Sequence, residues 1–201
     1  VAKFVERRKG KATEEKARVQ LRDPNYFGTM LIYMGKADGM VSGACHSTGD
    51  TVRPALQIVK MKPGCSRVSG AMVMLKGDER YLFSDIAINI TVDAQAMGEI
   101  AVESAKTAKT FDIDPKVALL SFSTKGSAVS PESEKVAEAT KIAQELAPEL
   151  PIDGELQFDA AFVASVGERK APGSKVAGHA NTFIFPSLEA GNIGYKIAQR
   201  F

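Results

Sequence analysis

The chain has 201 residues, of which 44% are hydrophobic and 25% are charged. This composition is typical of a globular protein and allows a buried core in one large domain or two small ones. A formal net charge of +2 is too small to indicate nucleic-acid binding, and no stretch approaches the roughly 20 apolar residues of a membrane helix. We therefore expect neither a nucleic acid nor a membrane among the partners.

The N-terminal third carries helix signals and one ambiguous segment. The basic opening KFVERRKGK is interpreted as a solvated face, as most short charge runs are. Thr13 precedes two acids and EKARVQL, which predicts a capped helix that ends at Asp23-Pro24. FGTMLIYM is apolar on both sides and fits either a buried helix or a strand. Met40-Val41 is a short strand candidate between glycines.

The stretch HSTGDTVRPALQIVK, from His46 to Lys60, allows two helix starts. Pro54 lacks an N–H and disfavours a helical residue before it, so the helix could begin at Pro54. Alternatively, the helix begins at a Ser47 cap and accommodates Pro54 in an early turn. Both alternatives place hydroxyl groups and a guanidinium close to a helix N-terminus.

Ser47, Thr48 and Arg53 are the residues of this stretch that suit a phosphate. Free N–H groups and the helix dipole attract an anion at a helix N-terminus, and arginine offers a planar fork that matches phosphate oxygens. The stretch is not a Walker loop, because it lacks GxxxxGKS. On the pattern alone an ordinary cap is the favoured explanation of Ser47 and Thr48, because caps are common and phosphate sites are rare; the phosphate site stays open as the alternative.

The rest of the chain alternates between strand and helix signals after a candidate boundary at residues 60–64. Gly77-Asp78 between two β-forming runs predicts a hairpin, and Asp93 is a natural cap for an amphipathic helix. Ser130 and Pro131 open another helix. Further segments are KVALLSFS and NTFIFPS as strands and LEAGNIGYKIAQR as a helix. This alternation predicts an α/β fold with helices on the faces of a sheet.

Two further groups of polar residues allow a site or a plain structural role. Ser123 and Thr124, within SFSTKGSAVS, follow a predicted strand, and open α/β sheets place ligands at the carboxyl ends of strands. On the pattern alone a merely polar turn is the favoured explanation of these two residues. Asp153, Glu155 and Asp159 could form a carboxylate cluster for a metal. Capping by Asp159 and solvation of the other two are the alternative.

The histidines and cysteines provide no recognisable catalytic set. Cys45 and Cys65 match neither a zinc site nor a disulfide framework, which favours a reduced, cytoplasmic protein without a bound metal. His46 and His179 lie far apart in sequence and have no assignable partner, so surface or packing roles are favoured. Cys45 has no activating base in view and is interpreted as an unreactive thiol.

Five segments together resemble the phosphate acetyltransferase (phosphotransacetylase) family, within the wider phosphate acetyl/butyryl transferases. They are ERRKGKATEEKA, LRDPNYFGTMLIYMGKADGMVSGACHSTGDTVRPALQIVK, ALLSFSTKGSA, IDGELQFDAA and FPSLEAGNIGYKIAQR. The resemblance implies acetyl transfer between coenzyme A and inorganic phosphate: acetyl-CoA plus phosphate gives acetyl phosphate plus CoA. The implied route is direct thiolate attack on acetyl phosphate, without an acetyl-enzyme at Cys45.

The same resemblance implies a fold, an assembly and a set of site residues. The fold is a three-layer α/β/α architecture similar to isocitrate and isopropylmalate dehydrogenases, with a cleft between two domains. The implied protein is a cytoplasmic homodimer with no bound cofactor, whose substrates are CoA or acetyl-CoA, phosphate and acetyl phosphate. HSTGDTVRP would hold the phosphoryl group, through Ser47, Thr48 and a catalytic Arg53. We predict that Ser123 and Thr124 also bind substrate.

The chain departs from the family in its extent. Family members continue beyond the equivalent of Phe201 into a segment with a Ser-Arg pair and an Asp, where the arginine helps bind the acyl phosphate and the Asp is proposed as the base. Ser66-Arg67 is a different motif. We expect an internal fragment that could be inactive in isolation, with part of a first α/β domain and its phosphate-binding loop at residues 1–62 and a second α/β domain at residues 63–201.

Three alternative functions remain at this point. The first is a phosphate butyryltransferase. The second is a non-catalytic module that binds CoA or forms a dimer. The third is a related sequence fused to a dehydrogenase, as in some malic enzymes.

Overall fold

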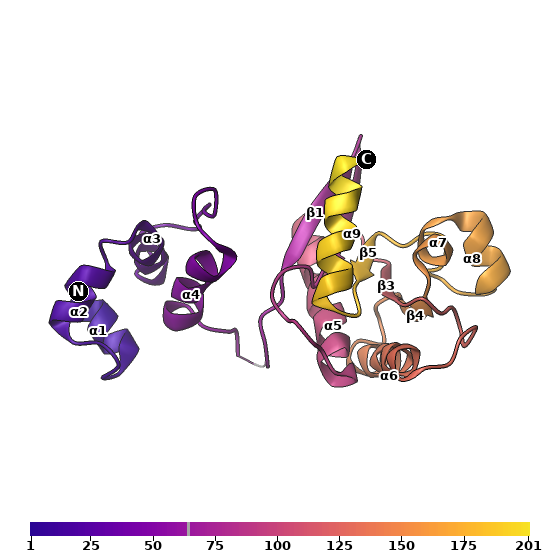
Figure 1. The fold of residues 1–201 in the computed structure, drawn as a ribbon, viewed down its shortest axis with the longest axis horizontal. Coiled ribbons are helices and arrows are strands. Elements are labelled where there is room, and N and C mark those ends of the chain that lie inside the picture. Colours follow the sequence, from indigo (N-terminus) through magenta and orange to yellow (C-terminus); the bar gives the residue numbers. More distant parts are fainter. Residues whose placement is uncertain (64) are drawn as a thin grey trace. The chain divides into compact units, whose positions relative to one another are not determined.

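The computed structural model describes residues 1–63 and 65–201, and the chain forms two compact units, Val1–Arg67 and Val68–Phe201 (Figure 1). The boundary predicted at residues 60–64 includes Gly64, which lies outside the described residues. Each unit has its own buried core.

The described residues of the first unit form four helices around a small core. They are α1 (Ala2–Arg8), α2 (Glu14–Gln20), α3 (Pro24–Tyr33) and α4 (Thr48–Ile58). Thr13 caps α2 as predicted, and its Oγ1 accepts a hydrogen bond from the N–H of Lys16. The core consists of Phe4, Ala12, Ala17, Tyr26, Met30 and Ile58.

Two apolar segments of the first unit receive a definite assignment. FGTMLIYM belongs to α3, whose first turn is capped by Asp23. The strand predicted at Met40-Val41 is wrong, because these residues have no regular secondary structure. Among the described residues of this unit there is no strand with which they could pair, and an isolated strand has no hydrogen-bonding partner.

Helix α4 begins at the Ser47 cap, so the second of the two predicted starts is correct. The Ser47 hydroxyl accepts a hydrogen bond from the N–H of Asp50, and the Thr51 hydroxyl donates to the Ser47 carbonyl. Pro54 lies inside the helix, where it removes the bond that its N–H would give to the carbonyl of Asp50. One missing bond is tolerated because the cap and the buried Ile58 hold the two ends.

The second unit contains a five-stranded sheet with the order β1-β2-β5-β3-β4. The strands are β1 (Ala71–Lys76), β2 (Glu79–Ser84), β3 (Val117–Leu120), β4 (Ile152–Leu156) and β5 (Thr182–Ile184). β1 is antiparallel to β2, and the other neighbours are parallel. The predicted hairpin at Gly77-Asp78 is confirmed, and Gly77 has a φ of 59° that glycine adopts readily.

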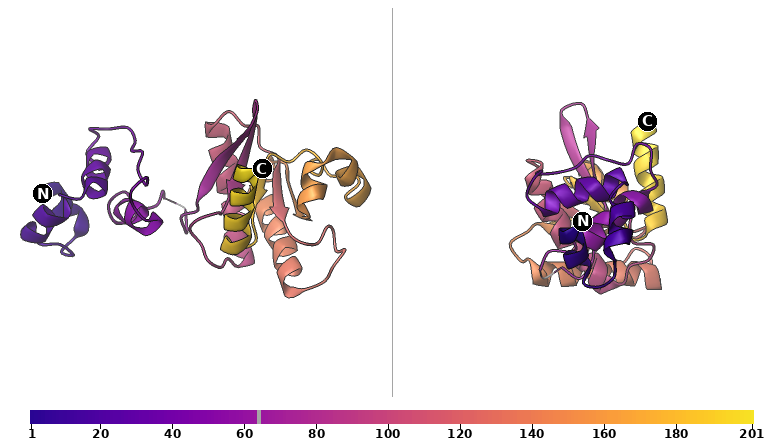
Figure 2. Two further views of the ribbon diagram at one scale, coloured as in Figure 1. Left: turned by 45° about the horizontal axis from the view of Figure 1, so that its top comes forward. Right: turned by 90° about the vertical axis from the view of Figure 1, so that its left-hand side faces the viewer.

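Helices cover both faces of this sheet (Figure 1, Figure 2). Val117 and Leu119 of β3 pack against α5 (Ala94–Thr110) and α6 (Pro131–Leu146). Ala118 and Leu120 belong to the core on the other face, which is covered by α7 (Phe158–Phe162) and α9 (Leu188–Arg200), while α8 (Ala164–Lys170) packs against α7. The alternation follows from the two-residue period of a strand. The unit is therefore a three-layer α/β/α sandwich, as predicted.

The predicted caps of the second unit are confirmed. Asp93 accepts a hydrogen bond from the N–H of Ala96 at 2.7 Å and begins α5. Ser130 and Ser133 exchange hydrogen bonds in a capping box at the start of α6, with Pro131 in the first turn. In the part of the chain that the structure describes, we find no helix with the length and apolarity needed to cross a bilayer.

Candidate active-site residues

The N-terminus of α4 brings Ser47, Thr48 and Arg53 onto one helix. The Ser47 hydroxyl donates to Oδ2 of Asp50 at 2.7 Å while it accepts from the Asp50 N–H at 3.1 Å. The N–H groups of Thr48 and Gly49 lie in the first turn, where no intrahelical acceptor exists. This end of α4 is the positive end of its helix dipole, and it therefore suits an anion.

Arg53 lies beside this helix start. Its Nη1 forms an ion pair with Oδ1 of Asp50 at 3.3 Å, and both side chains are more than half exposed to solvent. The other guanidinium nitrogen, Nη2, lies close to Gly49: a Cβ built on that glycine would be 3.8 Å from it. An exposed pair of this kind contributes little to stability, so an incoming phosphate could compete with Asp50 for the guanidinium at little cost.

A basic pocket lies at the other end of α4. It has a volume of about 230 Å³ and is lined by Arg7, Arg8, Lys9, Lys11, Leu56, Gln57 and Lys60. Arg7 is fixed there because its Nε donates to the carbonyl of Ile58 at 2.5 Å and its Nη2 donates to that of Val59 at 2.9 Å. Repulsion from Arg7, followed by burial and by the other cations, lowers the pKa of Lys60.

The sequence interpretation missed this pocket. It treated KFVERRKGK as a solvated face, whereas the structure joins four cations of this run to Lys60. The cations of α1 lie near Lys60 because α1 packs against α4, since Phe4 and Ile58 share one core. The sequence alone does not show that these two segments are in contact.

Ser123 and Thr124 lie in the second unit, on the loop after β3. The buried Ser123 hydroxyl donates to Oε1 of Glu155 at 3.0 Å and accepts from the N–H of Ala128 at 3.0 Å. The Thr124 hydroxyl donates to the side-chain oxygen of Gln157 and accepts from its backbone N–H. Both hydroxyls thus tie this loop to the end of β4, and their contact with substrate remains a prediction.

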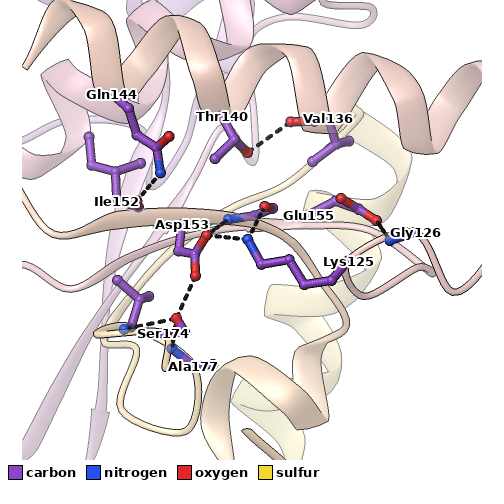
Figure 3. Close-up of polar contacts among 12 residues, drawn as sticks. Lys125, Gly126, Val136, Thr140, Gln144, Ile152, Asp153, Glu155, Ser174 and Ala177 are labelled. Atoms are coloured by element: carbon purple, nitrogen blue, oxygen red, sulfur yellow. Dashed lines mark hydrogen bonds and ion pairs between the residues drawn. The ribbon is translucent and has the colours of Figure 1, made fainter. Parts of the chain in front are cut away.

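The carboxylates of β4 hold the same loop (Figure 3). Oε1 of the buried Glu155 accepts from the N–H of Gly126 at 2.6 Å. The ammonium group of Lys125 contacts the carboxylate of Asp153 and donates to the carbonyl of Gly154 at 2.7 Å. Among the described residues, no group of three or more metal-ligating side chains is placed to hold a metal ion. Both carboxylates instead accept hydrogen bonds from their surroundings.

Asp159 is not the helix cap that the sequence suggested. Gln157 occupies the cap position of α7, and Asp159 lies in the first turn. Oδ2 of Asp159 forms an ion pair with Lys170 at 3.1 Å. The hydrogen bond from Lys170 lowers the pKa of Asp159.

The lowered pKa of Asp159 predicts a small acid-dependent loss of stability. The folded state binds this proton less readily than the unfolded chain, so the contribution is present above the ordinary carboxyl pKa of 3.8. It disappears as the pH falls through the folded value. Because Asp159 is half exposed, we expect about 0.2–1 kcal/mol. Urea midpoints of wild type and Lys170→Met, measured at pH 7 and pH 3, should differ less at pH 3; an equal difference would contradict the prediction.

The remaining sequence candidates show no catalytic arrangement in the described residues. Cys45 and Cys65 are both free thiols, with Cys45 exposed and Cys65 partly exposed. His46 is exposed beside Cys45, and His179 is exposed in the other unit. Their positions are compatible with the surface roles that the sequence favoured.

Comparison with known proteins identifies the family. The family model for phosphate acetyl/butaryl transferase matches residues 1–201. Phosphate acetyltransferase from Bacillus subtilis (strain 168) is 69% identical over 200 residues, and the match covers 100% of this chain and 62% of that protein. The chain therefore spans about three-fifths of the length of these curated relatives.

Solved structures agree with this comparison. EutD phosphotransacetylase from Staphylococcus aureus is 67% identical with a TM-score of 0.89, covering 98% of this chain and 61% of that one. A phosphotransacetylase from Streptococcus pyogenes is 66% identical with a TM-score of 0.90, covering 98% of this chain and 60% of that one. The chain belongs to the phosphate acetyl/butyryl transferase family.

Proposed function

We propose that the protein containing this chain transfers an acetyl group between CoA and inorganic phosphate. The observation that carries the proposal is the α4 N-terminus, where first-turn N–H groups and Thr48 begin the helix and Asp50 contacts both the Ser47 hydroxyl and the Arg53 guanidinium. Such a group suits the phosphoryl end of acetyl phosphate. Family membership and relatives named phosphate acetyltransferase support the same reaction.

The length of α4 suits a substrate with anionic groups far from its reacting end. The helix has 11 residues, which corresponds to about 16 Å at 1.5 Å per residue. The phosphate-binding residues lie at its start and the basic pocket lies at its end. CoA carries its phosphates well away from its thiol, so we place those phosphates at the basic pocket.

The proposed reaction is a direct acyl transfer. The CoA thiolate attacks the carbonyl carbon of acetyl phosphate, a C–S bond forms, the C–O bond to the phosphoryl group breaks and inorganic phosphate leaves. A free thiol has a pKa of about 8.5, so most of it is protonated at neutral pH and a base assists the attack. Arg53 and the helix N-terminus stabilise the charge that develops on the leaving phosphate. Cys45 takes no part.

Replacing Arg53 by glutamine in the full-length protein tests this assignment. We expect transition-state stabilisation to fall by about 1.5–3 kcal/mol, the range for a hydrogen bond to a charged group. The measurement is kcat and KM for acetyl phosphate in a CoA-dependent assay. Arg18→Gln is the matched control, because Arg18 is an exposed arginine paired with Glu14 on α2. Unchanged kinetics in Arg53→Gln would remove Arg53 from the site.

The finer features of the proposal rest on the family resemblance. We propose acetyl as the preferred acyl group, a homodimer as the assembly and the cytoplasm as the location, with no resident cofactor. Initial rates with acetyl and butyryl phosphate separate the acetyltransferase from a butyryltransferase. Absence of turnover with either acyl phosphate in the full-length protein would favour a non-catalytic module.

A further inference from the structure

We propose that Lys60 is a self-modification site, acetylated by acetyl phosphate that binds in the basic pocket. The proposal rests on the proposed function only for the supply of acetyl phosphate. It adds a covalent reaction at a residue outside the α4 N-terminus. The product would be a neutral acetyl-lysine at the wall of the pocket.

The pocket is built to attract an anion. Five of its seven lining residues are cationic and none is acidic: Arg7, Arg8, Lys9, Lys11 and Lys60. Arg7 cannot move away from Lys60 freely, because two carbonyl groups at the end of α4 hold its guanidinium. The Nε of Arg8 is buried and has no hydrogen-bond partner among the described residues. A phosphoryl group in this pocket would relieve the repulsion between these cations.

Lys60 is suited to act as the nucleophile in this pocket. It is exposed at the end of α4, so an acyl phosphate can reach its amine. Repulsion from Arg7 is the main cause of its lowered pKa, with burial and then Lys9, Lys11 and Arg8 as smaller causes. A lower pKa leaves a larger fraction of uncharged amine at neutral pH, and only the uncharged amine attacks a carbonyl.

The reaction balances with acetyl phosphate as the only reagent. Nζ of Lys60 attacks the acetyl carbonyl carbon, a C–N bond forms and the C–O bond to the phosphoryl group breaks. Inorganic phosphate leaves with the electron pair of that bond. The surplus proton on nitrogen passes to the phosphate or to water. The neighbouring cations stabilise the leaving phosphate as it separates.

Lys3 provides an internal control on the same helical unit. Its ammonium group forms a 3.0 Å ion pair with Glu6 on α1, and the hydrogen bond to Glu6 raises its pKa. It lies outside the pocket lining. An exposed lysine that is paired with a carboxylate and lies outside the pocket should therefore react more slowly with acetyl phosphate.

The experiment follows site-specific acetylation of the full-length protein by peptide mass spectrometry. The protein is incubated with acetyl phosphate in the absence of CoA, and in parallel with N-hydroxysuccinimidyl acetate, an uncharged acetyl donor. We expect Lys60 to react several-fold faster than Lys3 with acetyl phosphate, and added inorganic phosphate to slow Lys60 selectively. With the uncharged donor the preference should be smaller and insensitive to phosphate.

Charge variants test the role of the pocket. The double variant Lys9→Gln/Lys11→Gln removes two exposed cations, and Lys16→Gln removes one exposed cation outside the pocket lining. The double variant should lower the Lys60 preference measurably, because Arg7 and Arg8 remain in the pocket, while Lys16→Gln should leave the preference unchanged. Equal rates at Lys60 and Lys3, an unchanged preference in the double variant, or equal preference with both donors would overturn the proposal.

The proposed transferase function and the proposed acetylation of Lys60 can be contradicted independently of each other. Acetylation by added acetyl phosphate requires neither CoA nor turnover, so the labelling result does not depend on the transferase assay. A protein that labels selectively at Lys60 but does not consume acetyl phosphate with CoA would overturn only the proposed function. A protein that turns over but labels Lys3 and Lys60 equally would overturn only the self-modification.

Discussion

Replacing Phe183 by alanine should lower the free energy of unfolding of the second unit by about 3–5 kcal/mol. Phe183 is fully buried on β5, the central strand of the sheet. Its ring lies 5.3–6.3 Å, centroid to centroid, from four aromatic neighbours: Tyr81, Phe83, Phe158 and Phe162. Alanine would leave a cavity that these rings cannot fill without leaving their own positions.

The matched control for this prediction is Phe122→Ala. Phe122 is a phenylalanine of the same unit that is more than half exposed, and its removal should change stability by at most about 0.5 kcal/mol. Urea unfolding followed by far-ultraviolet circular dichroism measures both variants. A loss below about 1 kcal/mol in Phe183→Ala would mean that the aromatic cluster repacks around the missing ring.

Replacing Glu155 by alanine should destabilise the second unit by about 3 kcal/mol. Glu155 is 5% exposed, and its carboxylate accepts hydrogen bonds from the Ser123 hydroxyl and the Gly126 N–H. Each buried donor that loses its partner costs about 1–3 kcal/mol. The loop after β3 should loosen at the same time, because both bonds join it to β4.

Two further variants separate the lost hydrogen bonds from a general loss of acidic charge. Glu155→Gln keeps an acceptor oxygen and should lose less stability than Glu155→Ala. Glu149→Ala removes an exposed carboxylate near the same strand and should change stability little. Amide hydrogen exchange should accelerate at Gly126 in Glu155→Ala alone. Unchanged exchange at Gly126 would contradict the positioning of the loop by Glu155.

Local signals predicted the ends of several elements well. Thr13, Asp93 and Ser130 are caps in the structure because each side-chain oxygen satisfies an N–H of the first helical turn. The Gly77-Asp78 hairpin is equally local, since two residues determine the turn. Such features depend on a few neighbouring residues, so the sequence contains all the information they need.

Features that depend on distant contacts were not visible in the sequence. β4 was not predicted, because Asp153, Gly154 and Glu155 are poor strand formers, and pairing with β3 overrides their preference. The burial of Glu155 depends on a loop some thirty residues earlier in the chain. Pro54 suggested a helix start. The helix instead begins earlier and continues past Pro54, because the Ser47 cap and the packing of Ile58 stabilise its two ends.

The strand order has a consequence for synthesis on the ribosome. β5 lies between β2 and β3, although it is the last of the five strands in sequence. β1 can pair with β2, and β3 with β4, before β5 has been translated. Until then the nascent chain holds two half-sheets, and the edges of β2 and β3 that await β5 remain open to wrong pairing. The arrival of residues 182–184 therefore closes the sheet and ends this vulnerable period.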